Sequence, residues 1–543
     1  PVYCALETVP RYCRCFGVPL DDVRREPLID EPALRKKIER SLTKLFAADA
    51  AGRERGDDND GAADFLAQWL SFYGPMEERL IVGAHWPDRE RVEALLGNLR
   101  DEGAIIIDYL TEVAAGIEIC DRENLERLLR MLRRERRPAF EPLGIDHLPL
   151  YLAAWQGLTT SGDSPEHLQN ALEQLFGYAA PAAAWEEYIF PARLSYYNRS
   201  WLDGLFQNSD LVWTGRGKKK TSFCFDGERE LFRERAPDTA EALSVLPSLI
   251  GRFSFMECAG HAKLSTDELT DRLWELSWQG LISNDSYEVV RRGAYHGFSP
   301  SHLQRDDPAG VKAAFHRWES TRPMAGNWYV TPAGDDERDP MEEQELSRER
   351  VRQLLRRYGI LFRELLSQEL PPLAWGGLFK TLRLMELSGE IMSGMFFEGI
   401  PGIQFIAPEA LRMLSEPLPH EVVYWMNAAD PASLCGVNLE CLKALLPARR
   451  DSTFMVYRGT KPVVTALRNG AALEITVPPD DPRLPEYLSF IKTLLNRDFK
   501  PRSTLRVETV NGVRAGESPC VGALVGLGFT KYYRDLVMHR PYR

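Results

Sequence analysis

The sequence predicts a mainly helical α+β protein, in which tandem winged-helix modules are followed by a small β-barrel and a C-terminal α/β segment. Two observations support this fold class. A pattern of three helical runs followed by two short apolar strands recurs along the first three quarters of the chain. After it, short apolar runs alternate with Gly and Pro, which is typical of β-structure.

The clearest copy of the pattern covers residues 347–408. We expect Ser347 to cap its first helix and Gly359 to end that helix in a left-handed conformation. A short helical run at 362–366 follows, and a longer one passes through Trp375 to a stop at Gly389. Two β-like pieces, 391–398 and 404–407, complete the order expected of a winged helix.

Glycine spacing identifies three further copies. In the clearest copy, 30 residues separate the glycines that end the first and third helices. The corresponding intervals elsewhere are 29, 33 and 29 residues, beginning at Gly74, Gly177 and Gly251, although the looser interval of 33 ends at Asp210 rather than at a glycine. Repetition of one supersecondary unit is therefore the main architectural prediction.

The predicted domain boundaries follow this repeat. They are an N-terminal helical segment (1–61), a winged helix plus an arginine-rich helix (62–158), a winged helix with a basic wing (159–237), a winged helix plus a long connection (238–345), the clearest winged helix (346–415), a β-barrel (416–480) and a C-terminal segment that completes the barrel (481–543). In the barrel region we expect strands at 422–427, 454–457, 461–467 and 472–477, with hairpin turns at Arg458-Gly459 and Asn469-Gly470. Farther on, we expect a strand at 505–510 with a turn at Asn511-Gly512.

Composition limits the function classes. The net charge of -12 argues against a chain that coats nucleic acid along its whole surface, so any contact must be local. Nine cysteines without a C-x-x-C pair predict reduced, mostly buried thiols and hence a cytoplasmic protein. No apolar run of about 18 residues is present, which excludes a membrane span. Because the chain begins with Pro1 rather than Met, we expect it to be a fragment of a longer polypeptide.

Motifs for catalysis and metal binding fail on spacing. The run from Gly215 to Ser222 contains glycines and lysines but lacks the spacing of a phosphate-binding P-loop. The histidines are scattered, so no metal site is expected. Gln156 and Asp535 are of the type that positions a water for base excision. Their local sequence favours a packing or solvated role, so no catalytic residue is predicted.

The charge of the third helix distinguishes the modules that are candidates for DNA binding from those that are not. The helices at 87–102 and 266–279 carry more acids than bases, and an acidic helix is repelled by phosphate in a DNA groove. The modules at 160–225 and 347–408 remain as candidate DNA contacts, although the glycine-flanked wing tip of the former can also be interpreted as a solvated turn. The expected DNA-binding residues are Arg199, Arg216, Lys218, Lys219, Lys220, Arg352, Arg356, Arg357, Lys380 and Arg383.

A further run, 122–137, carries seven arginines against three glutamates on a helix with a leucine stripe. Its two interpretations are a solvated arginine face and a ridge that contacts phosphates.

Several segments together resemble the C-terminal region of the large helicase-related (Lhr) family. These segments are RVRQLLRRYGILFRELL at 350–366, LWELSWQGLISND at 273–285, WLDGL at 201–205, AADP at 428–431, VYRG at 456–459 and VETVNG at 507–512. The resemblance covers roughly residues 140–540. Members of that family are ATP-dependent 3′-to-5′ DNA helicases implicated in DNA repair, and this chain is similar to the part that follows the ATP- and Mg-binding core.

The resemblance implies a non-ATPase region without a cofactor of its own. Its implied roles are homo-oligomerisation and accessory DNA contacts, and its implied partners are DNA, a second copy of itself and the helicase core of the same polypeptide, but no membrane. The alternative, from a similar architecture in winged-helix DNA glycosylases, is an enzyme acting on damaged bases or crosslinks. No catalytic residue is transferred, because the glutamine-centred motif of those enzymes is not evident. A free-standing winged-helix regulator is a third hypothesis.

Overall fold

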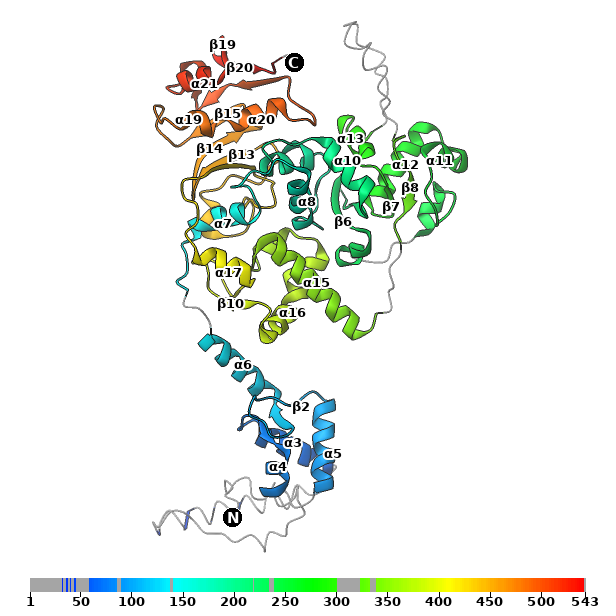
Figure 1. Ribbon diagram of the computed structural model, residues 1–543, viewed down its shortest axis with the longest axis vertical. Helices are drawn as coiled ribbons and strands as arrows, with labels where there is room; N and C mark the ends of the chain where they lie inside the picture. The colour runs from blue at the N-terminus through cyan, green and yellow to red at the C-terminus, as the bar shows by residue number, and fades with distance from the viewer. Residues whose placement is uncertain are drawn as a thin grey trace. The chain divides into compact units, whose positions relative to one another are not determined.

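The computed structural model describes residues 58–84, 89–136, 140–217, 219–233, 239–299, 323–332 and 338–541, with a few isolated positions between 32 and 44 (Figure 1). Contacts divide the chain into two compact units, Pro1–Ala139 and Phe140–Arg543. Most of the predicted N-terminal segment and Lys218 lie outside the described residues. In the part of the chain that is described, no helix is both long enough and apolar enough to cross a membrane.

The described part of the first unit forms one winged helix. Its elements are α3 (Asp58–Leu70), β1 (Met76–Glu77), α4 (Glu78–Ala84), α5 (Arg89–Asp101), β2 (Ile105–Asp108), β3 (Glu118–Asp121) and α6 (Arg122–Arg136). The strand order is β1-β3-β2, so the last strand lies between the other two. Leu66, Leu96 and Ile105 are buried in a small core of its own. Gly103 adopts φ 72° after α5, as the glycine spacing predicts.

The next copy begins the second unit. After α7 (Leu148–Trp155) come α8 (Pro165–Gln174), β4 (Ala180–Pro181), the π-helical turn η4 (Trp185–Ile189), α9 (Phe190–Arg193), α10 (Arg199–Asn208), β5 (Leu211–Gly215) and β6 (Lys220–Phe225). The strand order is β4-β6-β5, which is the order found in the first unit.

The copy that follows is longer than the sequence suggests. Its elements are η6 (Thr239–Ser244), α11 (Phe255–Ala262), α12 (Thr266–Trp278), β7 (Ile282–Asn284), α13 (Glu288–Tyr295) and β8 (Trp328–Val330). Phe253 forms an isolated antiparallel β-bridge with Trp328. Since β8 also pairs with β7, β8 lies between Phe253 and β7. The region expected to be a connection between modules therefore contains the last wing strand of this module. Trp328 is fully buried, which explains why a strand so far along the chain returns to the sheet.

The module predicted most clearly comprises α15 (Pro340–Tyr358), β9 (Ile360–Leu361), η7 (Leu365–Gln368), η8 (Pro371–Leu373), α16 (Trp375–Ser388), β10 (Met392–Gly394) and β11 (Gln404–Ile406), followed by α17 (Pro408–Ser415). The strand order β10-β11-β9 repeats the pattern and confirms tandem winged helices. The predicted cap at Ser347 is wrong. Asp339 caps α15 with a reciprocal contact from Glu342, so the helix begins two turns earlier.

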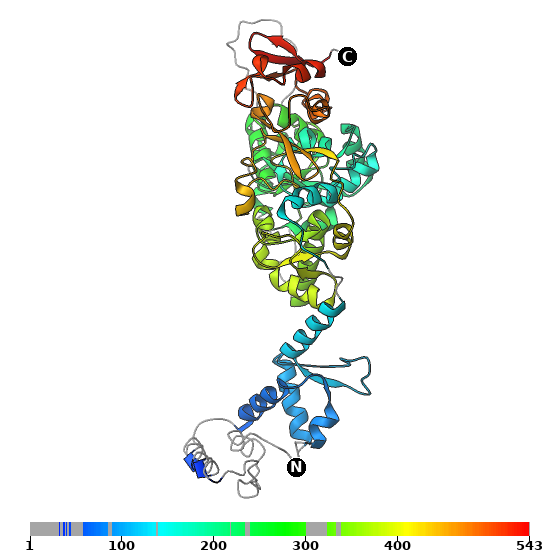
Figure 2. The same ribbon diagram turned by 90° about the vertical axis from the view of Figure 1, so that its left-hand side faces the viewer.

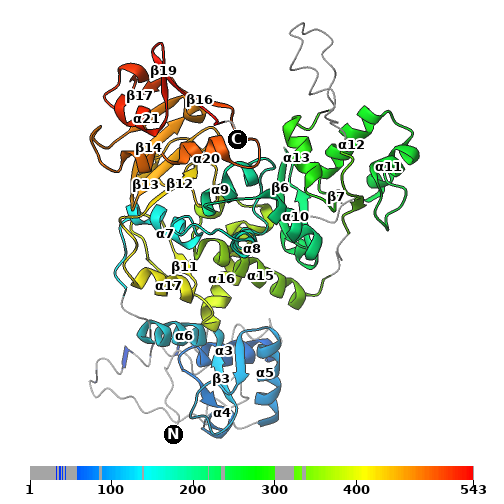
Figure 3. The ribbon, with the colours of Figure 1, turned by 45° about the horizontal axis from the view of Figure 1, so that its top comes forward.

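The C-terminal part holds two sheets, which are coloured from yellow-orange to red in Figures 2 and 3. The larger has the order β12 (Val423–Asn427), β13 (Phe454–Arg458), β14 (Lys461–Leu467), β15 (Ala472–Ile475), β17 (Thr509–Val510) and β18 (Val513–Arg514). The smaller has the order β16 (Thr504–Val507), β20 (Asp535–His539) and β19 (Thr530–Tyr532). The helices here are α18 (Glu440–Lys443), α19 (Leu484–Tyr487), α20 (Phe490–Asn496) and α21 (Val521–Leu527).

The predicted β-barrel is wrong, because β12 and β18 are opposite edges of an open sheet and do not pair with each other. Helices cover the apolar face that closure would bury. Phe490 of α20 packs against Trp425 and Phe454, and Tyr188 of η4 packs against Phe454 from another side. The predicted strand 505–510 splits into β16 and β17, which belong to different sheets. The three predicted hairpin turns are confirmed by the strand pairings on either side of them.

Candidate nucleic-acid interface

The helix α16 occupies the third-helix position of its module, the position that enters the major groove in helix-turn-helix proteins. Its inner side buries Leu378, Leu382 and Met385 in the core. Its outer side includes Gly376, Gly377, Phe379, Lys380 and the half-buried Arg383. The helix therefore presents a short face that combines two glycines, one aromatic ring and two cations.

The first turn of α16 contains two adjacent glycines, Gly376 and Gly377. Each costs a helix about 1 kcal/mol relative to alanine. Nevertheless a Cβ atom added to either one would meet no protein atom within 4 Å. Packing within the chain therefore does not require glycine here. A bare, uncapped helix N-terminus allows close approach of a phosphate to backbone N–H groups.

The exposed cations of this module differ in their partners. Lys380 and Arg356 are exposed and form no ion pair with a described residue. Arg383 lies 3.8 Å from a carboxylate oxygen of Glu386. Arg352 is held by three glutamates, Glu345, Glu349 and Glu390, and its hydrogen bond to Glu390 is the largest cause that raises its pKa. Lys380 and Arg356 are thus the cations most available to a phosphate.

Arg357 is not on the surface at all. Its side chain is fully buried, its guanidinium lies 2.5 Å from a carboxylate oxygen of Glu369, and it also donates to the carbonyl of Phe176. Burial acts to lower the pKa of Arg357, but the Glu369 carboxylate and the Tyr358 side chain together raise that pKa above its ordinary value. The prediction that Arg357 contacts DNA is therefore wrong, because the side chain joins two modules inside the core.

The basic wing of the β5–β6 hairpin packs against the neighbouring module. The Lys219 ammonium donates to the carbonyl of Gly297 at 2.6 Å, and the Gly217 N–H donates to the carbonyl of Trp278 at 2.7 Å. A Cβ atom on Gly215 would lie 1.8 Å from the carbonyl oxygen of Ser277, so the two backbones touch. Lys220 is half-buried, and the Arg216 guanidinium donates to Ser222 at 2.8 Å. The described part of this tip is an inter-module contact rather than a free projection.

Helix α10 is also fixed from outside its module. Arg199, at its start, lies 3.7 Å from Asp498. The buried Arg291 of α13 pairs with Glu186 at 2.8 Å and with Asp203 of α10 at 2.5 Å. Burial raises the pKa of the Glu186 carboxyl, and the Arg291 charge opposes that rise.

The acidic helix α12 exposes its carboxylates, as its composition suggests. Asp267, Glu268, Asp271 and Glu275 are exposed, and Arg272 is paired with Glu275 at 2.6 Å. A helix with this surface is repelled by a DNA groove.

The arginine-rich helix α6 belongs to the first unit. Its described ion pairs join arginines to glutamates one turn away, as in Arg127–Glu123 and Arg130–Glu126. This arrangement is typical of a solvated face.

Gln156 lines a cavity of about 570 Å³ that also borders Trp155, His167, Gln174 and Arg356. Its side-chain oxygen accepts a hydrogen bond from Arg193 at 2.8 Å. Asp535 is buried and accepts a hydrogen bond from Arg506 at 2.6 Å. Each side chain is thus engaged by an arginine through one of its oxygens.

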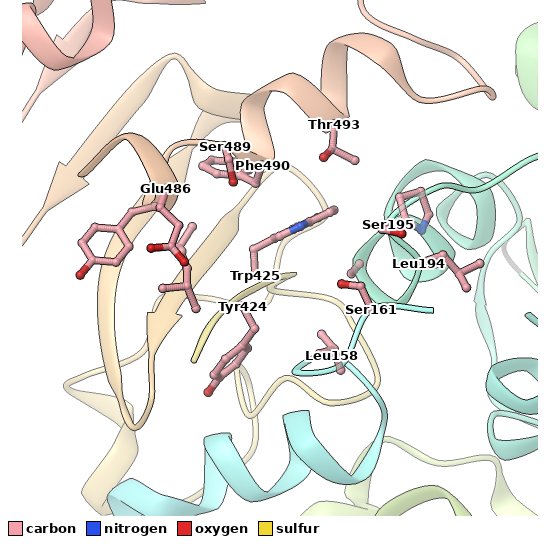
Figure 4. A pocket seen from close by; sticks show the side chains of 15 residues that line it. Leu158, Ser161, Leu194, Ser195, Tyr424, Trp425, Glu486, Ser489, Phe490 and Thr493 are labelled. Atoms are coloured by element: carbon pink, nitrogen blue, oxygen red, sulfur yellow. The ribbon is translucent and has the colours of Figure 1, made fainter. Parts of the chain in front are cut away.

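A second cavity, of about 250 Å³, lies between the α7–α10 region and the six-stranded sheet. Figure 4 shows Trp425 in its middle, with Phe490 and Thr493 of α20 on one side and Ser161 on the other. Five separate stretches of the chain build it, so no local sequence pattern could have identified it. In the described part of the chain, no group of three His, Cys, Asp or Glu residues is placed to hold a metal ion.

The glycine pair and Phe379 of α16 were not among the predicted site residues. The only sequence signal for them is a Gly-Gly step at the start of a helical run, where helix propensity disfavours it.

Comparison with known proteins connects this geometry to a family. The winged-helix domain of the large helicase-related protein matches at residues 340–425 and, as a second domain of that protein, at residues 145–228. The "Lhr helicase/uracil glycosylase" of Escherichia coli (strain K12) is 25% identical over 493 residues, covering 81% of this chain and 31% of that protein. The "Lhr helicase/ probable uracil glycosylase" of Mycolicibacterium smegmatis is 26% identical over 413 residues, covering 70% and 27%.

The chain thus spans less than a third of the length of either relative. Among solved structures, the Streptomyces sahachiroi DNA glycosylase AlkZ aligns with a TM-score of 0.36 and 15% identity, covering 65% of this chain and 96% of that one.

Proposed function

The chain belongs to the C-terminal, winged-helix region of the large helicase-related family, and on that premise we propose that it supplies accessory duplex-DNA contacts to a helicase of that family without hydrolysing ATP itself. The observation that carries this proposal is the outer face of α16. This face combines an uncapped, glycine-rich helix start with Lys380, which forms no ion pair with a described residue.

The spacing on α16 suits a phosphate contact. Gly376 and Lys380 are four residues apart and so lie on one side of the helix. The N-terminal residues of a third helix reach into the groove, while N–H groups and lysines meet the phosphates beside it. A contact confined to this face agrees with a net charge of -12, because such a charge disfavours binding along an extended surface of the chain.

We predict opposite effects on stability and binding when Gly376 and Gly377 are both replaced by alanine. The double variant should be more stable by about 0.5–1 kcal/mol per site, because alanine favours the helix. Its affinity for duplex DNA should fall at least about fivefold, because two methyl groups occupy the space of the phosphate. Urea unfolding and fluorescence anisotropy at fixed salt measure the two quantities.

Gly260→Ala in α11 is the matched control, since a Cβ atom there also meets no protein atom within 4 Å. It should raise stability and leave duplex affinity unchanged. Lys380→Glu should weaken duplex binding. It should also reduce, by about one, the slope of the logarithm of the binding constant against the logarithm of the salt concentration. Unchanged duplex affinity in both the glycine double variant and Lys380→Glu would refute the α16 interface.

Self-association and attachment to the helicase core are further parts of the proposed role. The module that contains the acidic α12 exposes the apolar side chains Ile250 and Met256, at 87% and 64%. We propose this module as the contact between copies. Light scattering should give a molar mass above that of one chain for the unaltered protein and a lower mass for the Ile250→Glu variant. A molar mass of one chain at every concentration of the unaltered protein would contradict this contact.

A second function, base excision, is favoured by the names of both curated relatives, which include uracil glycosylase. It predicts alkali-labile abasic sites in a duplex with one uracil or another damaged base. No abasic product with the chain in excess over the duplex would count against this activity.

A further inference from the structure

The hairpin formed by β19 and β20 ends in an unusual loop. Tyr532 pairs with Asp535, which leaves Tyr533 and Arg534 as a two-residue connection. Tyr533 adopts φ 54°, in the left-handed region that bulky residues rarely occupy. Loops of this length normally carry Asn or Gly where φ is positive. The fold therefore gives no reason for an aromatic residue at this tip.

The rings of Tyr532 and Tyr533 are both exposed to solvent. Tyr532 is 56% exposed and Tyr533 is 84% exposed, and their ring centroids lie 5.0 Å apart at 85°. The hairpin is anchored from its other side, where Leu536 is fully buried and the Gly516 N–H donates to the carbonyl of Arg534 at 2.8 Å. The aromatic tip is thus fixed in place without being covered by the described residues of the chain.

The surroundings of the rings carry more cations than acids. Lys531 and Arg534 flank the tyrosines on the hairpin, and both are exposed. Arg506 and Arg514 approach from β16 and β18, and the acids near them are Asp535 and Glu517. Lys531 forms no ion pair with a described residue. In a chain of net charge -12, this is a local surplus of positive charge beside exposed aromatic rings.

We propose that the β19–β20 hairpin binds single-stranded DNA by stacking unpaired bases on Tyr532 and Tyr533. Base–aromatic stacking needs only the flat face of a base, and nearby cations hold the strand through its phosphates. Duplex DNA does not offer those faces, because its bases stack on one another. The inference extends the proposed function, which concerns duplex DNA, and it rests on different residues.

The test is fluorescence anisotropy with an oligothymidylate of about 20 nucleotides. Tyr532→Ala with Tyr533→Ala should weaken binding at least about tenfold, whereas Tyr532→Phe with Tyr533→Phe should keep it, because the rings remain. Tyr109→Ala is the matched control, since Tyr109 is 68% exposed in the first unit. Wild-type affinity for the oligothymidylate in the double-alanine variant would overturn the proposal.

An abasic strand of the same length separates stacking from charge. The unaltered chain should bind it as weakly as the double-alanine variant binds oligothymidylate, and equal affinity for abasic and thymidylate strands would also overturn the proposal. Lys380→Glu should weaken duplex binding while leaving oligothymidylate binding unchanged. Loss of the duplex interface and loss of the hairpin interface are therefore distinguishable.

Discussion

Replacing Arg357 by alanine is expected to lower the free energy of unfolding of the second unit by about 3–5 kcal/mol. The substitution leaves the Glu369 carboxylate, whose side chain is 2% exposed, buried without its charge partner. It also removes the hydrogen bond to Phe176 and the guanidinium placed 5.5 Å from the centre of the Tyr178 ring. Urea unfolding followed by tryptophan fluorescence reports this loss, because most of the tryptophans lie in the second unit.

The neighbouring residue supplies the control. Arg356 is exposed and has no described ion-pair partner, so Arg356→Ala should change stability by no more than about 0.5 kcal/mol. Arg357→Ala should leave the duplex affinity of the folded fraction unchanged. A variant of unchanged stability but weakened DNA binding would return Arg357 to the DNA-contacting residues.

Replacing Asp430 by alanine is also expected to lower the free energy of unfolding of the second unit by about 3–5 kcal/mol. Two oxygens of Asp430 each accept a hydrogen bond from Arg193 at 2.9 Å, and both side chains are almost completely buried. The Arg193 guanidinium also donates to Gln156. The substitution therefore leaves the Arg193 charge buried without a carboxylate partner, where three segments of the chain meet. Hydrogen exchange should show that α9 and the end of β12 lose protection together, because the pair joins α9 to the turn that follows β12.

An exposed ion pair provides the contrast. Asp498, whose side chain is 36% exposed, lies 3.7 Å from Arg199. Asp498→Ala should therefore lower the free energy of unfolding by less than about 1 kcal/mol. Replacing Arg193 and Asp430 together by Met and Leu should recover most of the loss, since no buried charge then remains. A small effect of Asp430→Ala, comparable to that of Asp498→Ala, would contradict the buried bridge.

Local chemistry explains which parts of the fold were predictable. Gly359 and Gly389 end their helices with positive φ, and the glycine turns after Arg458 and Asn469 connect paired strands. Each needs only the conformational freedom of one residue and the apolar pattern beside it. The start of α15 was misplaced because a second capping pattern, Asp339 with Glu342, lies two turns upstream and competes with Ser347.

The sequence by itself determined the repeated winged-helix modules, the positions of strands β12 to β15 and the acidic surface of α12. Periodicity, glycine spacing and charge along one helix are short-range properties that a single chain displays directly. Only the tertiary structure decided that the larger sheet stays open, that Arg357 is buried and that the wing lysine Lys219 faces Gly297. These outcomes depend on contacts between residues tens to hundreds of positions apart, and such contacts leave no local pattern.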